Sequence, residues 1–361
     1  MSVAISPLVG CPKPLLVNVL AATATAVLLA GCGGGGSGPA PAPAPAAVSQ
    51  APAPSLVPSN KAPVGDAGTA LVARVGTATQ LDGSASKDDD GDTLSYAWTL
   101  TTKPAASNVS LTDSTSAKPS LTPDVPGTYV ATLVVSDGKA GSQAVTVKVL
   151  AEAVAFDSTP NPMPPNMSSY GFEANSLASL GDKVGLAGTA RLLRGVTVAM
   201  SSWACENGGW NGTCTTTPNA TFEHPVTIRL FDTGGTLLAT KTQTFKMPYR
   251  PSSDPACGTA WKAANGTCYN GFAFKLDFDL SSLEVTLPDT VVYEVAYNTQ
   301  HYGAVPVGVT GPYDSLNVGA YKTTAAPSVG SDVDPGSNRQ NGATKADTYS
   351  PMVQIVVTDT P

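Results

Sequence analysis

The densest group of potential metal ligands is a run of aspartates in the stretch SKDDDGDTL. Four of them fall within five positions: Asp88, Asp89, Asp90 and Asp92. Such a run is typical of a calcium loop, a helix start or a charged turn. An EF-hand loop needs glycine at position six and glutamate at position twelve, but aligning Gly91 with position six puts Ala97 at position twelve. The run is therefore not an EF-hand.

Cysteines are the second chemical feature. Of the six cysteines, four lie in the C-terminal half: Cys205, Cys214, Cys257 and Cys268. An even number in an exported chain predicts disulfides. The simplest pairing is local, Cys205 with Cys214 and Cys257 with Cys268, although two crossed connectivities are also open. Neither pair has the gap of two to four residues that zinc knuckles use, which disfavours zinc.

Both cysteine pairs carry tryptophan beside Asn, Gly and Thr, in WACENGGWNGTC and CGTAWKAANGTCY. Aromatic faces with amide and hydroxyl groups suit sugar recognition, and a closed loop lowers the ordering cost of binding. Trp210 and Trp261 are the candidates for stacking, and the alternative is that they cover the ends of a sandwich. Other polar-aromatic positions complete the candidate ligand-binding set: Tyr269, His301 and Tyr302.

Catalytic motifs are not found in the sequence. His224 and His301 are the only histidines, and neither His-Glu-x-x-His nor Gly-x-Ser-x-Gly occurs. Acidic residues are available for glycosidase chemistry, but no spacing singles out a pair. Asp332 and Asp334 could hold a metal, with a solvated turn favoured. We therefore predict a protein that is not an enzyme.

The surrounding pattern predicts β-structure throughout. Leu94, Tyr96, Trp98 and Leu100 alternate with polar or small residues, which is the period of a strand with one buried face. Further strands are expected in the C-terminal half at 226–232, 237–245, 272–280, 291–297 and 352–357. The net charge of −7 disfavours nucleic acid and basic attachment to anionic lipid.

Three motifs occur in order between residues 60 and 150: NKAPVGDAG, LDGSASKDDDGDTLSYAW and TPDVPGTYVATLVVSDG. They resemble a polycystic kidney disease (PKD) domain, an immunoglobulin-like sandwich. The resemblance implies that Trp98 lies between the sheets. Some members of the family bind calcium through the aspartate loop and the start of the first strand. The residues that match those positions are Asn60, Asp88, Asp90 and Asp92. A solvated acidic turn is the alternative.

The N-terminal segment has the features of an export signal. Lys13 precedes a mostly apolar run that ends in Leu29-Ala30-Gly31-Cys32. This tetrapeptide resembles the lipobox of bacterial lipoproteins, which implies that Cys32 carries lipid and becomes the first residue. Gly33 after it implies outer-membrane delivery in a host with two membranes. The Gly/Ser and Ala-Pro sequence that follows predicts a spacer.

These observations give an all-β chain in five parts. They are a signal peptide at 1–31, a disordered linker at 32–58, a PKD-like immunoglobulin-fold domain at 59–150, a Pro-rich linker at 151–166 and a larger β-sandwich at 167–361. The segments SSWAC, AYNTQHYG, GPYDSLNVG and SVGSDVDP resemble an exported bacterial domain without an assigned function.

The predicted function is a non-catalytic envelope lipoprotein. Its C-terminal domain would bind a polysaccharide or an envelope protein, with the PKD-like domain as a spacer and calcium as the one expected cofactor. An extracellular hydrolase or its accessory module, and a purely structural envelope protein, are the alternatives.

Overall fold

The computed structural model describes residues 59–172, 174–175, 177–209, 212–298, 301–302, 305–306, 315–323 and 325–359, with the backbone alone at 301–302 and 305–306. The chain divides into two units, Met1–Val57 and Pro58–Pro361. The predicted signal peptide at 1–31, the predicted lipidation site Cys32 and the predicted spacer at 32–58 lie outside the described residues. In the part of the chain that is described, no helix is long and apolar enough to cross a membrane.

Four strands form the main sheet of the N-terminal domain: β1 (Leu71–Arg74), β3 (Ser95–Thr102), β5 (Gly127–Ser136) and β6 (Val145–Asp157). A short ribbon, β2 (Thr79–Gln80) with β4 (Ser120–Leu121), lies apart from it. β5 alternates strictly between buried and half-buried residues, as the sequence predicts. Trp98 is 5% exposed and belongs to the core with Tyr129 and Leu133, so its predicted place is confirmed.

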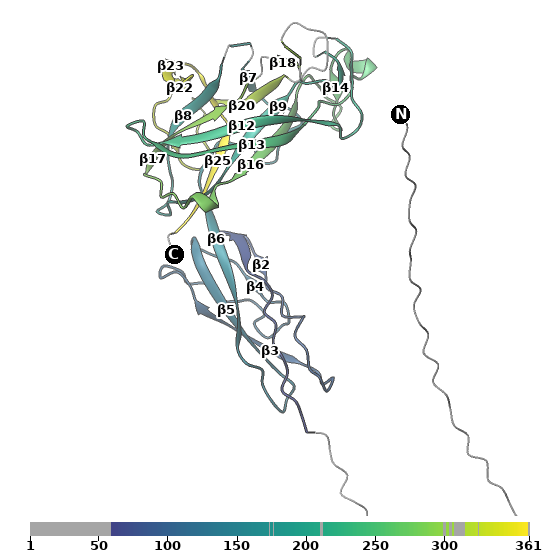
Figure 1. Cartoon of the computed structure of the whole chain (residues 1–361), viewed down its shortest axis with the longest axis vertical. Helices are drawn as coiled ribbons and strands as arrows, with labels where there is room; N and C mark the ends of the chain where they lie inside the picture. The colour runs from purple at the N-terminus through teal and green to yellow at the C-terminus, as the bar shows by residue number, and fades with distance from the viewer. Residues whose placement is uncertain are drawn as a thin grey trace, which may run out of the picture. The chain divides into compact units, whose positions relative to one another are not determined.

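β6 corrects the predicted domain boundary. We expected a linker from residue 151, but β6 continues without a break to Asp157 and pairs there with β25 (Val353–Thr358). Ala155 and Phe156 are fully buried, and the dense prolines begin only at Pro160. One strand therefore passes from the N-terminal sheet into the C-terminal domain (Figure 1).

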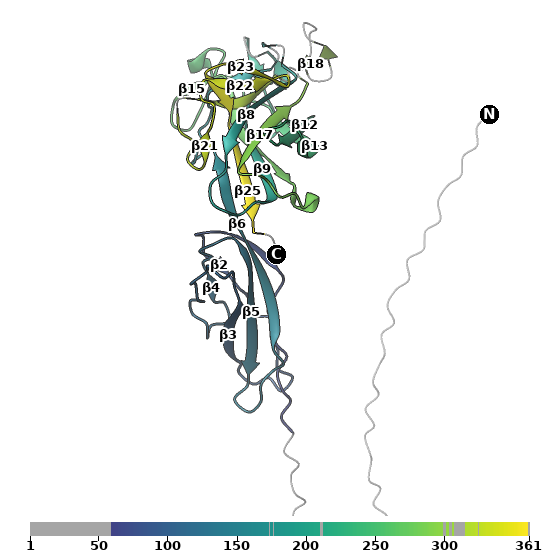
Figure 2. The same ribbon diagram turned by 90° about the vertical axis from the view of Figure 1, so that its left-hand side faces the viewer.

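Two sheets form the C-terminal domain (Figure 2). Besides β6 and β25, the first contains β7 (Ser169–Gly171), β9 (Leu192–Ser202), β16 (Phe272–Asp279), β20 (Leu316–Lys322) and β24 (Tyr349–Pro351). The second contains β8 (Ser179–Gly185), β12 (Thr221–Phe231), β13 (Leu237–Pro248), β17 (Thr290–Ala296), β21 (Ser331–Asp332), β22 (Ser337–Gln340) and β23 (Ala343–Ala346).

A single apolar core draws on both sheets, with Phe156, Val198 and Phe278 from the first and Ile228, Leu230 and Val295 from the second. The strands expected at 226–232 and 237–245 are confirmed as a hairpin, because β12 and β13 pair antiparallel along their whole length around the turn at 233–235. The fold is therefore all-β, with a larger sandwich after the PKD-like domain.

Short elements complete the chain. They are the ribbons β10 (Asn207–Gly208) with β11 (Cys214–Thr215), β14 (Trp261–Lys262) with β15 (Cys268–Tyr269) and β18 (His301–Tyr302) with β19 (Val305–Pro306), and the 3₁₀ turns η1 (Pro255–Cys257) and η2 (Ser281–Leu283). The first two ribbons each contain disulfide-bonded cysteines, and they border the candidate site.

Candidate functional site

Two disulfides close neighbouring loops of the C-terminal domain. Cys205 is bonded to Cys214 and Cys257 to Cys268, which is the local connectivity. Ser253 joins the two loops, because its amide donates to Cys214 O (2.9 Å) and its hydroxyl donates to Thr259 O (2.8 Å). The loops therefore form one connected structure.

Arg250 holds this structure from inside. Its side chain is fully buried, and its guanidinium donates to Cys205 Sγ (3.2 Å), Asn270 O (3.1 Å) and Thr259 O (2.9 Å). Burial lowers the pKa of Arg250. Hydrogen bonds to a charged group contribute about 1.5–3 kcal/mol each, so the arginine fixes both loops. Sequence reasoning missed it, since nothing near Arg250 marks it as buried.

The structure separates the predicted aromatic residues. Trp261 is 7% exposed, its indole N–H donates to Gly271 O (2.8 Å), and Phe272 packs edge-on against it. It is part of the packing of its loop and presents no open stacking face. Tyr269 is half-buried beside Trp261 and accepts a hydrogen bond from Asn265. Trp210 lies outside the described residues, and His301 and Tyr302 are described only as backbone in β18.

A groove of about 450 Å³ adjoins the loop that the Cys205–Cys214 disulfide closes; this loop and the one closed by Cys257–Cys268 are called the stapled loops below. Its lining includes two aromatic residues, Tyr249 and Phe272, together with Thr216, Asn219 and Ser252. Ser252 Oγ accepts from the amide of Thr216 (2.9 Å), which fixes this wall. Aromatic faces beside hydroxyl and amide groups are what we expected of the tryptophans, and the fold supplies them from other residues.

The aspartate loop of the N-terminal domain is already engaged in hydrogen bonds. Asp88 Oδ1 accepts from the amides of Asp90 (2.9 Å) and Asp92 (3.2 Å). Asp90 accepts from the amide of Lys61 (2.7 Å), and Lys139 Nζ lies 2.8 Å from Asp92 Oδ2. Asp88 Oδ2, by contrast, is buried and has no hydrogen-bond partner among the described residues.

Asn60, the fourth predicted calcium ligand, donates from Nδ2 to Asp137 Oδ2 (2.8 Å). The pKa of Asp137 is lowered to about 2, first by the amide of Ala140 and then by Asn60. In the described residues these carboxylates do not form a group of three ligands within 4.8 Å, whereas another cluster of the molecule does. Calcium at this loop stays a prediction.

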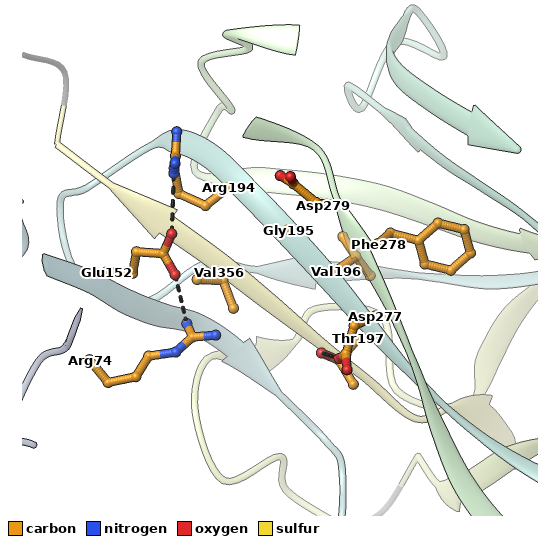
Figure 3. A pocket seen from close by; sticks show the side chains of 10 residues that line it. All are labelled: Arg74, Glu152, Arg194, Gly195, Val196, Thr197, Asp277, Phe278, Asp279 and Val356. Atoms are coloured by element: carbon orange, nitrogen blue, oxygen red, sulfur yellow. Dashed lines mark hydrogen bonds and ion pairs between the residues drawn. The ribbon is translucent and has the colours of Figure 1, made fainter. Parts of the chain in front are cut away.

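A second cavity, of about 230 Å³, lies where β6 passes from the N-terminal sheet into the first sheet of the C-terminal domain (Figure 3). Glu152 of β6 stands between two arginines there, 3.6 Å from Arg74 Nη1 and 3.2 Å from Arg194 Nε. The Glu152 side chain is only 12% exposed, so these ion pairs are shielded from solvent more than ordinary surface pairs. The cluster links β1, β6 and β9, which indicates a structural role.

The fold and its two disulfides indicate an extracellular or exported all-β protein. Residues 67–150 match a family model that describes a PKD domain. This part of the chain is a PKD domain, and the C-terminal sandwich lies outside the match. No curated protein matches the sequence.

Several solved structures are similar to parts of the chain. A nucleoside hydrolase-related hypothetical protein from Saccharophagus degradans, associated with carbohydrate metabolism, is 25% identical over 26% of this chain and 26% of its own (TM-score 0.24). The chain thus spans about a quarter of that protein. The PKD domain of KIAA 1837 protein is 32% identical over 26% of this chain and 91% of its own (TM-score 0.23). Carbohydrate-binding modules from the β-sandwich superfamily are 12% identical over 72% of this chain and 97% of their own (TM-score 0.26).

Proposed function

We propose that this protein is a lipid-anchored binding protein of the bacterial envelope, whose C-terminal sandwich binds a polysaccharide in the groove beside the stapled loops. The groove supports this best, because Tyr249 and Phe272 offer ring surface while Thr216, Asn219 and Ser252 offer hydroxyl and amide groups. Sugars present both apolar faces and hydroxyls, so they match this lining. An envelope protein as ligand is the alternative outcome.

Rigidity of the groove favours binding without large ordering costs. The Cys205–Cys214 disulfide, the Ser252–Thr216 hydrogen bonds and buried Arg250 fix its walls. A preformed site keeps more of its interaction energy as affinity than a loop that must order on binding. This is the same advantage that the sequence indicated for the stapled loops.

The anchor and the PKD domain complete the proposal. Lipid on Cys32, delivery to the outer membrane and a Gly/Ser and Ala-Pro spacer would hold the binding domain away from the membrane surface. Calcium at Asn60, Asp88, Asp90 and Asp92 would stiffen the PKD domain. Asp88 Oδ2, buried without a partner among the described residues, supports that part.

The binding proposal is tested with a Cys32→Ser form of the full chain, purified and incubated with insoluble polysaccharides and isolated cell-wall material. Tyr249→Ala should reduce retention by roughly two- to tenfold, since stacking contacts contribute about 0.5–1.5 kcal/mol. Tyr96→Ala, which removes a half-buried tyrosine of the PKD domain, is the matched control. Retention of the Tyr249 variant at the wild-type level would exclude the groove.

Trp210→Ala and Trp261→Ala separate the predicted stacking residues. Trp261→Ala should lower the melting temperature, because it removes a buried ring and its hydrogen bond. Trp210→Ala tests the original stacking prediction directly. Lost retention with an unchanged melting temperature would assign Trp210 to the site.

The anchor has its own measurement. Cys32→Ser should abolish labelling by a fatty-acid probe and release the protein from membranes. Unchanged membrane fractionation with unchanged labelling would refute the lipid attachment.

A further inference from the structure

Three aspartates from two distant stretches of sequence meet in the C-terminal domain. Asp182 lies in β8, Asp332 ends β21 and Asp334 follows in the turn before β22. One carboxylate oxygen of each lies within 4.8 Å of the others. Within residues 59–359 as far as they are described, none of the three forms an ion pair. Three carboxylates thus converge without an ion-pairing cation among the described residues.

Burial makes this convergence costly. Asp182 is 1% exposed; its Oδ1 accepts from the amide of Lys183 (2.8 Å), and its Oδ2 is 3.5 Å from the Tyr321 hydroxyl, long for a hydrogen bond. Asp332 Oδ2 and Asp334 Oδ1 are also buried, and neither has a hydrogen-bond partner in the described part of the chain. Buried carboxylates with unmatched oxygens cost several kcal/mol unless a partner neutralises them.

Two neutral oxygens provide an independent observation. Ser350 is fully buried, its hydroxyl is close enough to Asp182 to lower the pKa of that carboxyl, and no hydrogen bond of good geometry satisfies it among the described residues. Asn338 is 2% exposed and donates from Nδ2 to Tyr349 O (2.6 Å), whereas its Oδ1 is likewise unsatisfied.

The strand register brings Asn338 close to the aspartates. Arg339 pairs with Gly181 and Asp332 pairs with Val184, so the turn from Asp332 to Asn338 lies along the Asp182–Lys183 stretch of β8. The buried Oδ1 of Asn338 is therefore a candidate donor from the same turn as two of the aspartates.

We propose that Asp182, Asp332 and Asp334, together with Asn338 Oδ1 and Ser350 Oγ, form a calcium-binding site. All five donors are oxygens, the ligand atoms that hard cations prefer. The set includes neither the sulfur nor the imidazole ligands that are typical of zinc. Magnesium usually keeps several waters and uses one or two carboxylates, whereas this site offers three carboxylates and two neutral oxygens in a buried setting. Calcium fits this donor set better.

The ion would connect β8 with the segment from β21 to β24. Burial is the largest cause that raises the pKa of Asp182, to about 7, with like charge from Asp332 adding to it. A bound divalent cation offsets both effects. Calcium would thus stabilise the edge of the second sheet, which is distant in sequence from the aspartate loop of the PKD domain.

The site is tested on the full chain carrying Cys32→Ser, stripped with EDTA and titrated with calcium chloride. We expect the melting temperature to rise, with half-saturation near 10⁻⁴–10⁻³ M as in other extracellular modules. Terbium should replace calcium and emit on tyrosine excitation, because the Tyr321 hydroxyl lies 3.5 Å from Asp182 Oδ2 and Tyr293 is the strand partner of Asp182. Magnesium at equal concentration should give a smaller thermal shift.

Variants assign the response to this cluster. Asp332→Asn with Asp334→Asn should weaken calcium at least about tenfold and abolish the terbium signal, since affinity follows ligand charge. Glu223→Gln removes one exposed charge of the same domain and should change neither readout. Asp88→Asn with Asp90→Asn alters the PKD loop alone, so the cluster's response should persist.

Two results would overturn the site. One is the absence of any thermal or terbium response at millimolar calcium. The other is a response that Asp332→Asn with Asp334→Asn leaves at the wild-type level or that Asp88→Asn with Asp90→Asn removes. If the double variant does not fold, the single Asp334→Asn change at a half-buried position, checked by circular dichroism, decides by the same criteria.

Discussion

The molecule has two acidic regions that differ in how their charges are matched. In the aspartate loop of the PKD domain, the carboxylates accept hydrogen bonds from backbone amides and lie beside Lys61 and Lys139. In the C-terminal domain, Asp182, Asp332 and Asp334 meet with no cation of the protein beside them in the described residues. The first region is conspicuous in the sequence, and the second is conspicuous only in the fold.

This difference shows that local acidic density is a poor guide to a metal site. A dense run can satisfy most of its own oxygens, because adjacent aspartates accept hydrogen bonds from one another's amides and exposed lysines are close by; Asp88 Oδ2 is the buried exception among the described residues. Burial decides more, since an unmatched oxygen in the interior has no water to bond with. The following predictions test this contrast between the two regions.

The largest effect is expected from Asp182→Asn in the buried cluster. With calcium at about 100 times its dissociation constant, binding stabilises the wild type by about 2.7 kcal/mol, and the variant should lose most of this. In EDTA the variant should equal or exceed the wild type in stability, because it removes a buried charge. Thermal unfolding of both proteins with calcium and with EDTA shows whether the order of their stabilities reverses when calcium is removed.

The matched control is Glu223→Gln at an exposed position of the same domain, where the free energy of unfolding should change by less than about 1 kcal/mol in either condition. An Asp182→Asn variant that is equally destabilised with and without calcium would show that Asp182 acts only through packing. The proposed difference between the buried cluster and the aspartate loop would then be refuted.

Sequence reasoning anticipated the regular part of the molecule. The period-two pattern around Trp98 and in 272–280 predicted strands that the structure contains as β3 and β16, and the even number of cysteines predicted disulfides, with the local pairing as the simplest of three connectivities. These features are encoded locally, so one window of sequence suffices to see them.

What the sequence did not show depends on distant contacts. In the sequence, nothing distinguishes Arg250 from an ordinary surface arginine. Its burial depends on three hydrogen-bond acceptors that only the fold brings around its guanidinium. Asp182 is far from Asp332 in the chain, and only the pairing of β8 with β21 and β22 unites them. The sequence left Trp261 as a candidate either for stacking or for packing, and the structure favours packing because Phe272 arrives from another strand and covers it.

A smaller effect is expected from acid in the PKD domain. Asp124 accepts from the Ser107 hydroxyl, the Asn108 amide and the Tyr129 hydroxyl, and these bonds lower its pKa to about 2, with Ser107 the largest cause. A lowered folded pKa means that this stabilisation is complete above the unfolded value of 3.8 and is lost as the pH falls through 2.

Tryptophan fluorescence, to which the buried Trp98 contributes, should therefore include a transition of the PKD domain between pH 4 and pH 2, and Asp124→Asn should weaken this pH dependence. The measurement is an acid titration of both proteins in EDTA. Identical profiles for the variant and the wild type would mean that Asp124 does not control this transition. Ser95→Ala, at an exposed position of the same domain, is the control.

The smallest effect is expected where a lysine competes with calcium in the PKD loop. Lys139 Nζ lies 2.8 Å from Asp92 Oδ2, and its side chain is 61% exposed. An exposed pair of this kind contributes less than about 1 kcal/mol, so Lys139→Gln should strengthen calcium binding at the loop by no more than about fivefold. Lys118→Gln, which removes an exposed lysine paired with Asp82, serves as the matched control.

Calorimetric titration in the Asp332→Asn, Asp334→Asn background isolates the loop. A Lys139→Gln variant with unchanged affinity would show that the lysine does not compete, and a loop that binds no calcium in either form would leave the buried cluster as the one calcium site of the two. The contrast would then be complete, because the denser acidic sequence would be satisfied by its own amides and lysines.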